Sequence, residues 1–305
     1  MPKPFEMYKY DLTILTDRRY DNPSELNDYI INVILEDRLL RDALEEKGLK
    51  IFRTHWDNPD FVWTRTRYAI FRTTWDYFDR IEAFIPWLEK TAELTQFINP
   101  ISLLKWNMDK HYLRDLQQNG IEIPDTIFIE KGEKRALSEI ASDKNWAEYI
   151  LKPAISGAAR HTYRFEKEGT AQFESIFAML IANESMLLQE FQKNILTKGE
   201  IALMLFGGRF SHAVLKLAKA GDFRVQDDFG GTVHDYMPTE EEIHFAEKVI
   251  TTISPLPAYA RVDIFWDNEG KPVVSELEMI EPELWFRKSE KAADMLASHI
   301  FANYF

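Results

Sequence analysis

The 305-residue sequence contains no cysteine. Its absence excludes disulfide bridges, thiolate nucleophiles, iron–sulfur clusters and cysteine-ligated zinc sites. Basic residues are scarce relative to acidic ones, because 37 lysines and arginines accompany 50 aspartates and glutamates and leave a formal net charge of −13. A charge of this sign argues against sequence-independent binding of nucleic acid and against attachment to an anionic membrane surface, since both require a basic face.

Long apolar runs and several common active-site motifs are also missing. No run approaches the roughly 18 apolar residues of a membrane span, and the opening segment MPKPFEMYKY lacks the apolar core of a secretion signal. We therefore expect a cytoplasmic protein. The sequence contains neither a P-loop nor a GxGxxG, HExxH or GxSxG motif, so the sites that these motifs build lose their main support.

The residues that are present indicate a globular protein of two or three domains, with 45% hydrophobic residues. Short apolar runs at 10–15, 49–52 and 68–71 predict strands. Between the first two runs, apolar residues at spacings of three and four predict a helix that opens at Asn22. This order of elements is typical of a small α/β domain, which we expect to end near residue 97.

Downstream, the sequence predicts antiparallel hairpins with helices packed on them. Gly207-Gly208 is the strongest hairpin signal, because it separates two apolar runs by a two-residue turn. The expected helices span 105–118, 173–183 and 239–253, and the expected strands span 126–129, 148–151, 186–191, 201–206, 210–217, 259–266 and 272–279.

The segment ARVDIFWDNEGKPVVSELEMIEP carries the most informative pattern. Alternate residues of a strand share a face, and residues directly opposite each other in a hairpin project to the same face. If the loop spans residues 268–271, Asp263 lies opposite Glu276 and Arg261 lies opposite Glu278. This register gathers three carboxylates and one guanidinium into one patch.

Three carboxylates at such close range repel one another. Two like charges about 4 Å apart cost on the order of 4 kcal/mol at an effective dielectric constant near 20, and one arginine does not neutralise three acids. Hard oxygen ligands without histidine or cysteine select magnesium or manganese, usually with phosphate oxygens completing the coordination. The hairpin therefore indicates a divalent metal site beside a phosphate. The alternative is a solvated acidic edge.

Two lysines and an arginine offer charge for an anion. Lys152 ends an apolar run and precedes the small-residue loop AISGAA, an arrangement that would cradle a phosphate with backbone N–H groups. Lys110 and Arg224 are further candidates for binding an anion. Arg224 lies in a polar stretch bracketed by Gly221 and Gly230. The alternative for each is an ordinary surface residue.

Taken in order, seven segments resemble the ATP-grasp superfamily. They are NxxxxxxWNxDKxYLxxLxxxGIxIPxT, LKPxxSG, LLQEF, GEIxLxxFGGxFSHAVxK, GDFRVQxxxGG, ARVDI and SELEMIEP. The resemblance covers about residues 99–286 and is strongest to glutathione-synthetase-like members and to the ligase that closes the cycloserine ring. It implies a small amino-terminal α/β domain at 1–97, followed by two α+β subdomains at 98–185 and 186–305 whose antiparallel sheets clamp a nucleotide.

The resemblance also implies a role for each matching residue. ATP would contact Lys110, Lys152, Ser156, Gly157, Gln189, Glu190, Phe191 and Glu200; two magnesium ions, or manganese, would bind Asp263, Glu276 and Glu278; and Arg261, Arg224 and Lys216 would act on the reacting groups. Three departures stand out. Glu278 occupies a position where many relatives have asparagine, the loop after Lys152 is poor in glycine, and the segment before Glu200 is long.

The implied activity is ATP-dependent ligation of a carboxylate to an amine or another nitrogen, through an acyl phosphate, on a small amino-acid-like or peptide-like substrate. The alternatives are a phosphotransferase acting on a small hydroxylated substrate and a non-catalytic nucleotide-binding protein. In the amino-terminal domain, Arg72 and Trp75 are candidate substrate contacts, against the alternative that they only pack. A homodimer is compatible with the sequence, which does not specify an oligomeric state.

Overall fold

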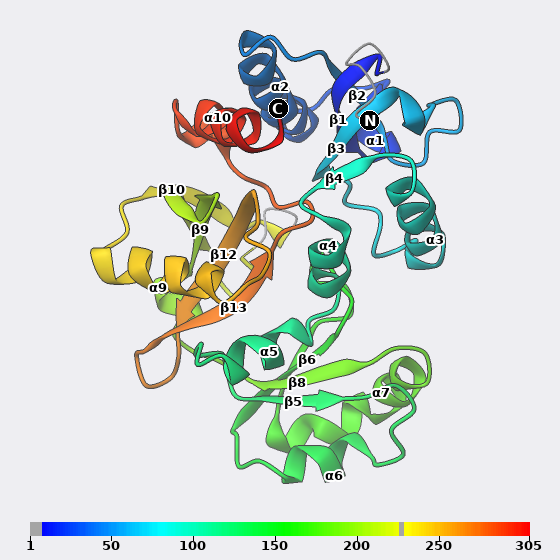
Figure 1. Cartoon of the computed structure of the whole chain (residues 1–305). Coiled ribbons are helices and arrows are strands. Elements are labelled where there is room, and N and C mark those ends of the chain that lie inside the picture. Colours follow the sequence, from blue (N-terminus) through cyan, green and yellow to red (C-terminus); the bar gives the residue numbers. More distant parts are fainter. Residues whose placement is uncertain (1–7, 226–228) are drawn as a thin grey trace.

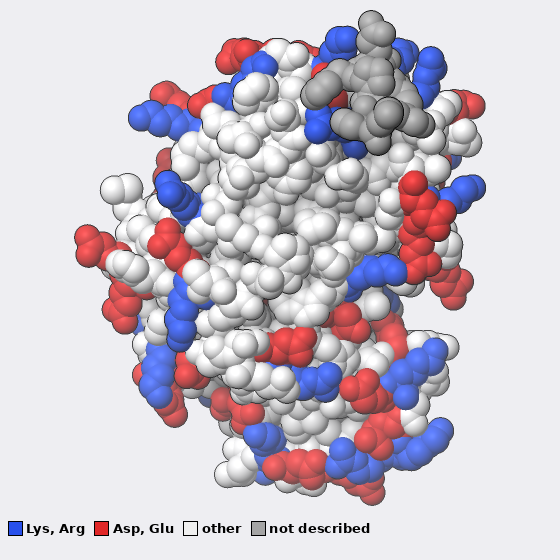
Figure 2. All heavy atoms as spheres, in the orientation of Figure 1, with Lys and Arg blue, Asp and Glu red and all other residues white. Residues whose placement is uncertain are grey.

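A computed structural model describes residues 8–225 and 229–305. These residues form three sheets, with the amino-terminal sheet at the top of Figure 1 and the sheet of the middle segment at the bottom. Within the described residues, no helix has the length and apolar character needed to cross a membrane. On the face shown in Figure 2, acidic and basic side chains are interspersed around a largely uncharged central area.

The first sheet is parallel and has the strand order β2-β1-β3-β4. Its elements are β1 (Tyr10–Thr16), α1 (Arg18–Asp21), α2 (Asp28–Glu46), β2 (Ile51–His55), β3 (Thr66–Thr73), α3 (Ile81–Ala92) and β4 (Gln96–Ile98), together with α10 (Ala292–Tyr304) from the end of the chain. Leu12 and Ile14 pack against α2 and α10, whereas Leu15 and Phe71 pack against α3. Alternation along the strands therefore builds an apolar core on both faces.

The three predicted strands of this domain are confirmed, with the second displaced toward the carboxyl end. The helix begins later than predicted, at Asp28 rather than near Asn22. Asn27 caps it by accepting a hydrogen bond from the backbone N–H of Ile30 at 2.8 Å, which satisfies one of the free donors of the first turn.

The second sheet is antiparallel and has the order β11-β10-β9-β12-β13. Its elements are β9 (Glu200–Phe206), β10 (Arg209–Leu217), β11 (Thr232–Tyr236), α9 (Glu240–Thr251), β12 (Tyr259–Trp266) and β13 (Pro272–Glu278). Gly207 and Gly208 form the predicted turn, both with positive φ as its backbone requires. Alternation sends Leu203 and Val262 toward α9 and leaves the polar residues of the strands on the opposite face.

The third sheet is also antiparallel and has the order β5-β8-β6-β7. Its elements are β5 (Thr126–Ile129), α6 (Leu137–Ser142), β6 (Glu148–Pro153), β7 (Tyr163–Glu166), α7 (Glu174–Ile181) and β8 (Met186–Glu190), with the short α8 (Ile195–Lys198) after it. Tyr149 and Leu188 pack with α6 and α7. The alternate residues Ile150, Lys152 and Gln189 lie on the other face and border a cavity shared with the second sheet.

The predicted helix at 105–118 is wrong as a single element. The chain instead forms α4 (Ile101–Asn107) and α5 (Tyr112–Gln118). At the break, the backbone N–H of Lys110 donates to the carbonyl of Ala154 at 2.9 Å, a bond that a continuous helix would not allow. The interruption therefore fixes Lys110 beside the loop that follows β6.

We retain the three-part division of the chain as a proposal and place its second boundary after Glu190 rather than after residue 185. The reason is that β8 pairs with β5 and β6 and so belongs to the third sheet. The terminal helix α10 also packs on α2, so the last part of the chain contributes to the amino-terminal domain.

Candidate active site

The hairpin of β12 and β13 brings the predicted acids together. Asp263 is paired with Glu276 and Arg261 with Glu278, which confirms both predicted pairs. The loop is one residue longer than predicted, because Trp266 rather than the next residue pairs at the end of the strand.

A β-bulge compensates for the longer loop. Ser275 has no pairing partner in β12, so the register shifts by one and returns to the predicted pairs. The bulge also turns Ser275 and Glu276 toward the same cavity. There the hydroxyl of Ser275 donates to Oε2 of Glu200 at 2.8 Å.

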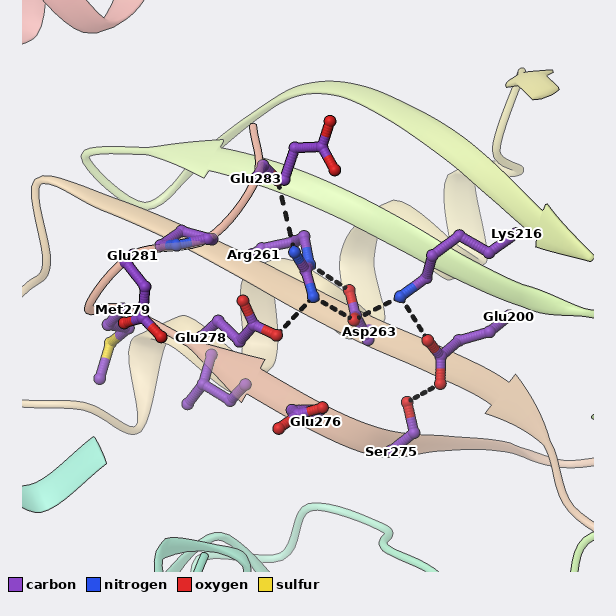
Figure 3. Close-up of polar contacts among 12 residues, drawn as sticks. Glu200, Lys216, Arg261, Asp263, Ser275, Glu276, Glu278, Met279, Glu281 and Glu283 are labelled. Carbon is purple, nitrogen blue, oxygen red and sulfur yellow. Dashed lines mark hydrogen bonds and ion pairs between the residues drawn. The ribbon is translucent and has the colours of Figure 1, made fainter. Parts of the chain in front are cut away.

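Asp263 lies at the centre of a charge network (Figure 3) and is 1% exposed. Arg261 donates to both of its oxygens, from Nε and Nη2, each at 2.8 Å, and Nη2 also donates to Oε1 of Glu278 at 2.5 Å. Lys216 lies 2.7 Å from Asp263 and 2.5 Å from Glu200. Burial works to raise the pKa of Asp263, but the two cations outweigh it and hold that pKa below its usual value.

Glu276 and Glu278 differ in how far neighbouring cations offset the effect of burial on their pKa values. Oxygens of Asp263, Glu276 and Glu278 lie within 4.8 Å of one another. Burial opposes ionisation of Glu276, yet Lys110, 3.1 Å away, and Lys152 lower its pKa. At Glu278, burial dominates over Arg261 and raises the pKa to about 7. Among these three acids, Glu278 is therefore the one whose burial is not offset by its neighbouring cation.

Two lysines face Glu276 from the opposite side. Lys110 donates to the carbonyl of Ser156 at 2.5 Å, which joins it to the loop after β6. Lys152 has no ion-pair partner within the described part of the chain. Burial lowers its pKa to about 8 despite the attraction of Glu276. Both ammonium groups are placed to meet an anion near the acids.

A cavity runs between the second and third sheets and is lined by Lys110, Lys152, Glu200, Lys216, Arg261, Glu276 and Glu278, whereas Asp263 is not among its lining residues. Six further residues that the sequence predicts to be in the site also line this cavity: Ser156, Gly157, Gln189, Glu190, Phe191 and Arg224. Gln189 donates to the hydroxyl of Thr126 at 2.9 Å. Arg224 is held by Asp222, at 2.7 Å. The middle of the polar stretch after Arg224, residues 226–228, lies outside the described residues.

A second cavity adjoins the first on the side of the amino-terminal domain. Trp75 lines it and donates from its indole nitrogen to the carbonyl of Glu281 at 2.9 Å. Arg72 borders neither cavity: it is fully buried, donates to the carbonyl of Pro282 at 3.0 Å and lies over the Phe286 ring. The charge of Arg72 is thus used inside the domain in this structure, and its contact with substrate stays a prediction.

Comparisons with known proteins agree with this arrangement. Residues 12–99 match the family described as the N-terminal domain of D-cycloserine synthetase DcsG, and residues 120–256 match the ATP-grasp domain of prokaryotic glutathione synthetase. The chain is 26% identical over 275 residues to cycloserine biosynthesis protein DcsG of Streptomyces lavendulae, covering 83% of this chain and 89% of that protein. The chain contains an ATP-grasp domain.

Solved structures support the same fold. The crystal structure of D-cycloserine synthetase DcsG matches with a TM-score of 0.82 at 24% identity, covering 95% of this chain and 98% of that one. D-alanine–D-alanine ligase from Bacillus anthracis matches with a TM-score of 0.63 at 15% identity, covering 96% of each chain. The chain thus has the ATP-grasp fold and is an ATP-dependent carboxylate–amine ligase, which forms a carbon–nitrogen bond.

Sequence reasoning missed the residues that hold the ATP-grasp hairpin in place. Asn107 donates to the carbonyl of Leu277 at 2.8 Å and accepts from the backbone N–H of Met279 at 2.6 Å. Asn99 donates to the carbonyl of Met279 at 2.9 Å. Both asparagines stand in the first motif of the resemblance, which was the only signal for them.

Proposed function

We propose that this ligase is magnesium-dependent and converts the carboxylate of a small amino-acid-like or peptide-like substrate into an acyl phosphate, which an amine then attacks. The observation that carries the proposal is the position of Arg261. It borders both cavities, together with Lys216, Glu278, Gly157 and Ala158. A nucleotide in the first cavity and a substrate in the second would therefore meet at its guanidinium.

The donor set of the hairpin fits magnesium. Asp263, Glu276 and Glu278 provide oxygen ligands alone, within 4.8 Å of one another, which suits a hard dication better than a softer metal. These residues would hold two magnesium ions, and manganese would suit the same ligands. Bound there, the metal would neutralise phosphate charge during transfer.

The other predicted residues take roles that their positions support. Lys110, Lys152, Ser156 and Gly157 border the first cavity near the acids, where they would contact the phosphates. Gln189, Glu190 and Phe191 border it at the end of β8, where they would bind adenine. Glu200 would bind the hydroxyls of the ribose. These hydroxyls would have to displace Ser275 or Lys216 from the Glu200 carboxylate.

The chemistry explains why such a cluster is useful. A carboxylate does not react with an amine at neutral pH, because the oxide that must leave is too basic. Phosphorylation replaces it with phosphate, and catalysis then depends on positioning and on charges that match those of the transition state. Arg261 would stabilise the oxyanion formed when the amine attacks, with Lys216 and Arg224 near the departing phosphate.

The test is ADP release by the purified protein with magnesium and ATP, measured against pairs of carboxylic acids and amines. We expect release to require both partners, and hydroxylamine to trap the activated acid as a hydroxamate. ADP release that needs only an alcohol, with phosphate retained on it, would instead establish a phosphotransferase.

Paired variants link the activity to the hairpin. Asp263→Asn should lower turnover by roughly 10²-fold or more, since it removes an acceptor shared by Arg261 and Lys216. Glu269→Gln is the matched control, because Glu269 lies in the same hairpin but pairs only with Lys271 at the surface. Equal turnover in the two variants would contradict the assignment of the site.

A further inference from the structure

The second cavity opens where the topology of the amino-terminal sheet reverses. β1 is central, with β2 on one side and β3 on the other, all parallel. In such sheets, the chains leaving the carboxyl ends of the two diverging strands separate and leave a crevice that binds ligands. Arg19 and Tyr20 follow β1, Trp75 and Phe78 follow β3, and all four line this cavity.

Arg19 is held in the cavity wall by an acid that has no exposure of its own. Nε and Nη2 of Arg19 donate to the carboxylate of Asp17, with Nη2 2.6 Å from Oδ2. The side chain of Asp17 is fully buried, whereas that of Arg19 is 59% exposed. The Asp17 carboxylate thus uses one edge of the guanidinium and fixes its plane.

The other edge of the same guanidinium is free to bind. Nη1 of Arg19 donates no hydrogen bond within residues 8–225 and 229–305. Nη1 and Nη2 together form the fork that accepts a carboxylate through two parallel hydrogen bonds. Because Asp17 already restricts the Arg19 side chain, little conformational freedom would be lost when a carboxylate binds to Nη1 and Nη2.

The position of Arg19 separates it from the reacting carboxylate. Arg261 and Glu278 border both cavities, so the acid to be phosphorylated belongs at their end. Arg19 borders only the second cavity, beside the aromatic residues Tyr20 and Trp75. An anion on Arg19 is therefore a different group from the one that receives phosphate.

We propose that Arg19 binds a carboxylate that the reaction leaves intact, and that one substrate is consequently an amino acid that keeps its own carboxylate while its amine is joined. This inference rests on the proposed function. Asp17 acts as a positioning residue for Arg19.

The experiment compares amino acids with their decarboxylated amines as the amine partner, for example D-serine and L-serine against ethanolamine, and D-alanine and L-alanine against ethylamine. ADP release is measured for the full chain and for Arg19→Gln. We expect Arg19→Gln to raise KM for the amino acid by on the order of 10-fold to 100-fold with little change in kcat, and to leave the amine unaffected. Asp17→Asn should change KM in the same direction, and Arg19→Lys should recover part of the loss.

Arg18→Gln is the matched control, because Arg18 is 67% exposed, pairs with Asp57 at 3.5 Å and does not line the cavity. Equal losses for amino acids and amines in Arg19→Gln, or equal effects of the Arg18 and Arg19 variants, would overturn the inference. A wild-type chain that releases no additional ADP with any pair of acid and amine would instead overturn the proposed function on which it rests.

Discussion

The backbone of Gly157 lies directly against the ring of Phe78. A Cβ added at Gly157 would stand 2.5 Å from Cε1 of that ring, closer than side-chain carbons approach. Gly157 belongs to the loop after β6, and Phe78 to the amino-terminal domain, so this contact joins the wall of the first cavity to that of the second.

We predict that Gly157→Ala lowers kcat/KM for ATP and for the acid substrate together, each by roughly 10-fold or more, because the loop must move away from the position in which we propose that it binds phosphate. Phe78→Leu in the same chain should restore most of the loss by making room for the new methyl group. Steady-state kinetics of the single and double variants test this. Losses that simply multiply in the double variant would show that the two sites do not interact.

Nucleotide affinity should pass through a maximum between about pH 7 and pH 8. The pKa of Glu278 is raised by burial to about 7, so a magnesium–nucleotide complex must displace its proton at lower pH. The pKa of Lys152 is lowered by burial to about 8, so at higher pH this lysine has lost the charge that a phosphate needs. Affinity therefore rises with pH through the first value and falls through the second.

Calorimetric titration with magnesium and a non-hydrolysable ATP analogue, in buffers of different ionisation enthalpy, measures this directly. We expect net proton release below pH 7 and net proton uptake above pH 8. Glu278→Gln should remove the acidic limb and Lys152→Arg the alkaline limb. A pH-independent affinity in the wild type would contradict both assignments.

Asn107 should matter for stability more than its polar side chain suggests. Asn107→Leu leaves the carbonyl of Leu277 and the N–H of Met279 buried without partners, at a cost of about 2–4 kcal/mol in the free energy of unfolding. Urea denaturation measures it. Asn183→Ala is the control, because Asn183 is exposed just after α7 and its side chain, among the described residues, donates only to the carbonyl of Met179, and it should change stability by no more than about 0.5 kcal/mol.

The sequence predicted the acidic patch but not how the chain achieves it. Alternation along β12 and β13 correctly placed Asp263 opposite Glu276, because which residues share a face depends only on the period of the strand. The longer loop and the bulge at Ser275 were missed. The extra residue in the loop and the unpaired residue in the bulge cancel, so the pairs beyond the bulge are those predicted. Neither feature can be detected in the alternation of polar and apolar residues.

Other features depend on contacts between distant segments. The break at Lys110 follows from a hydrogen bond to Ala154, so helical periodicity alone predicted one continuous helix. Arg72 and Arg19 both follow or end buried strands in the sequence, yet one donates to Pro282 inside the domain and the other borders a cavity. Only the arrangement of the carboxyl-terminal segment distinguishes them.

The packing of α10 on α2 has a consequence for dissecting the protein. Leu296 and Ile300 of α10 pack in the same apolar cluster as Leu12 and Leu40, so an isolated fragment ending near residue 97 would expose that surface to water. A fragment of the amino-terminal domain should therefore need the terminal helix, supplied as a separate peptide or through a circularly permuted chain, before it can be studied on its own.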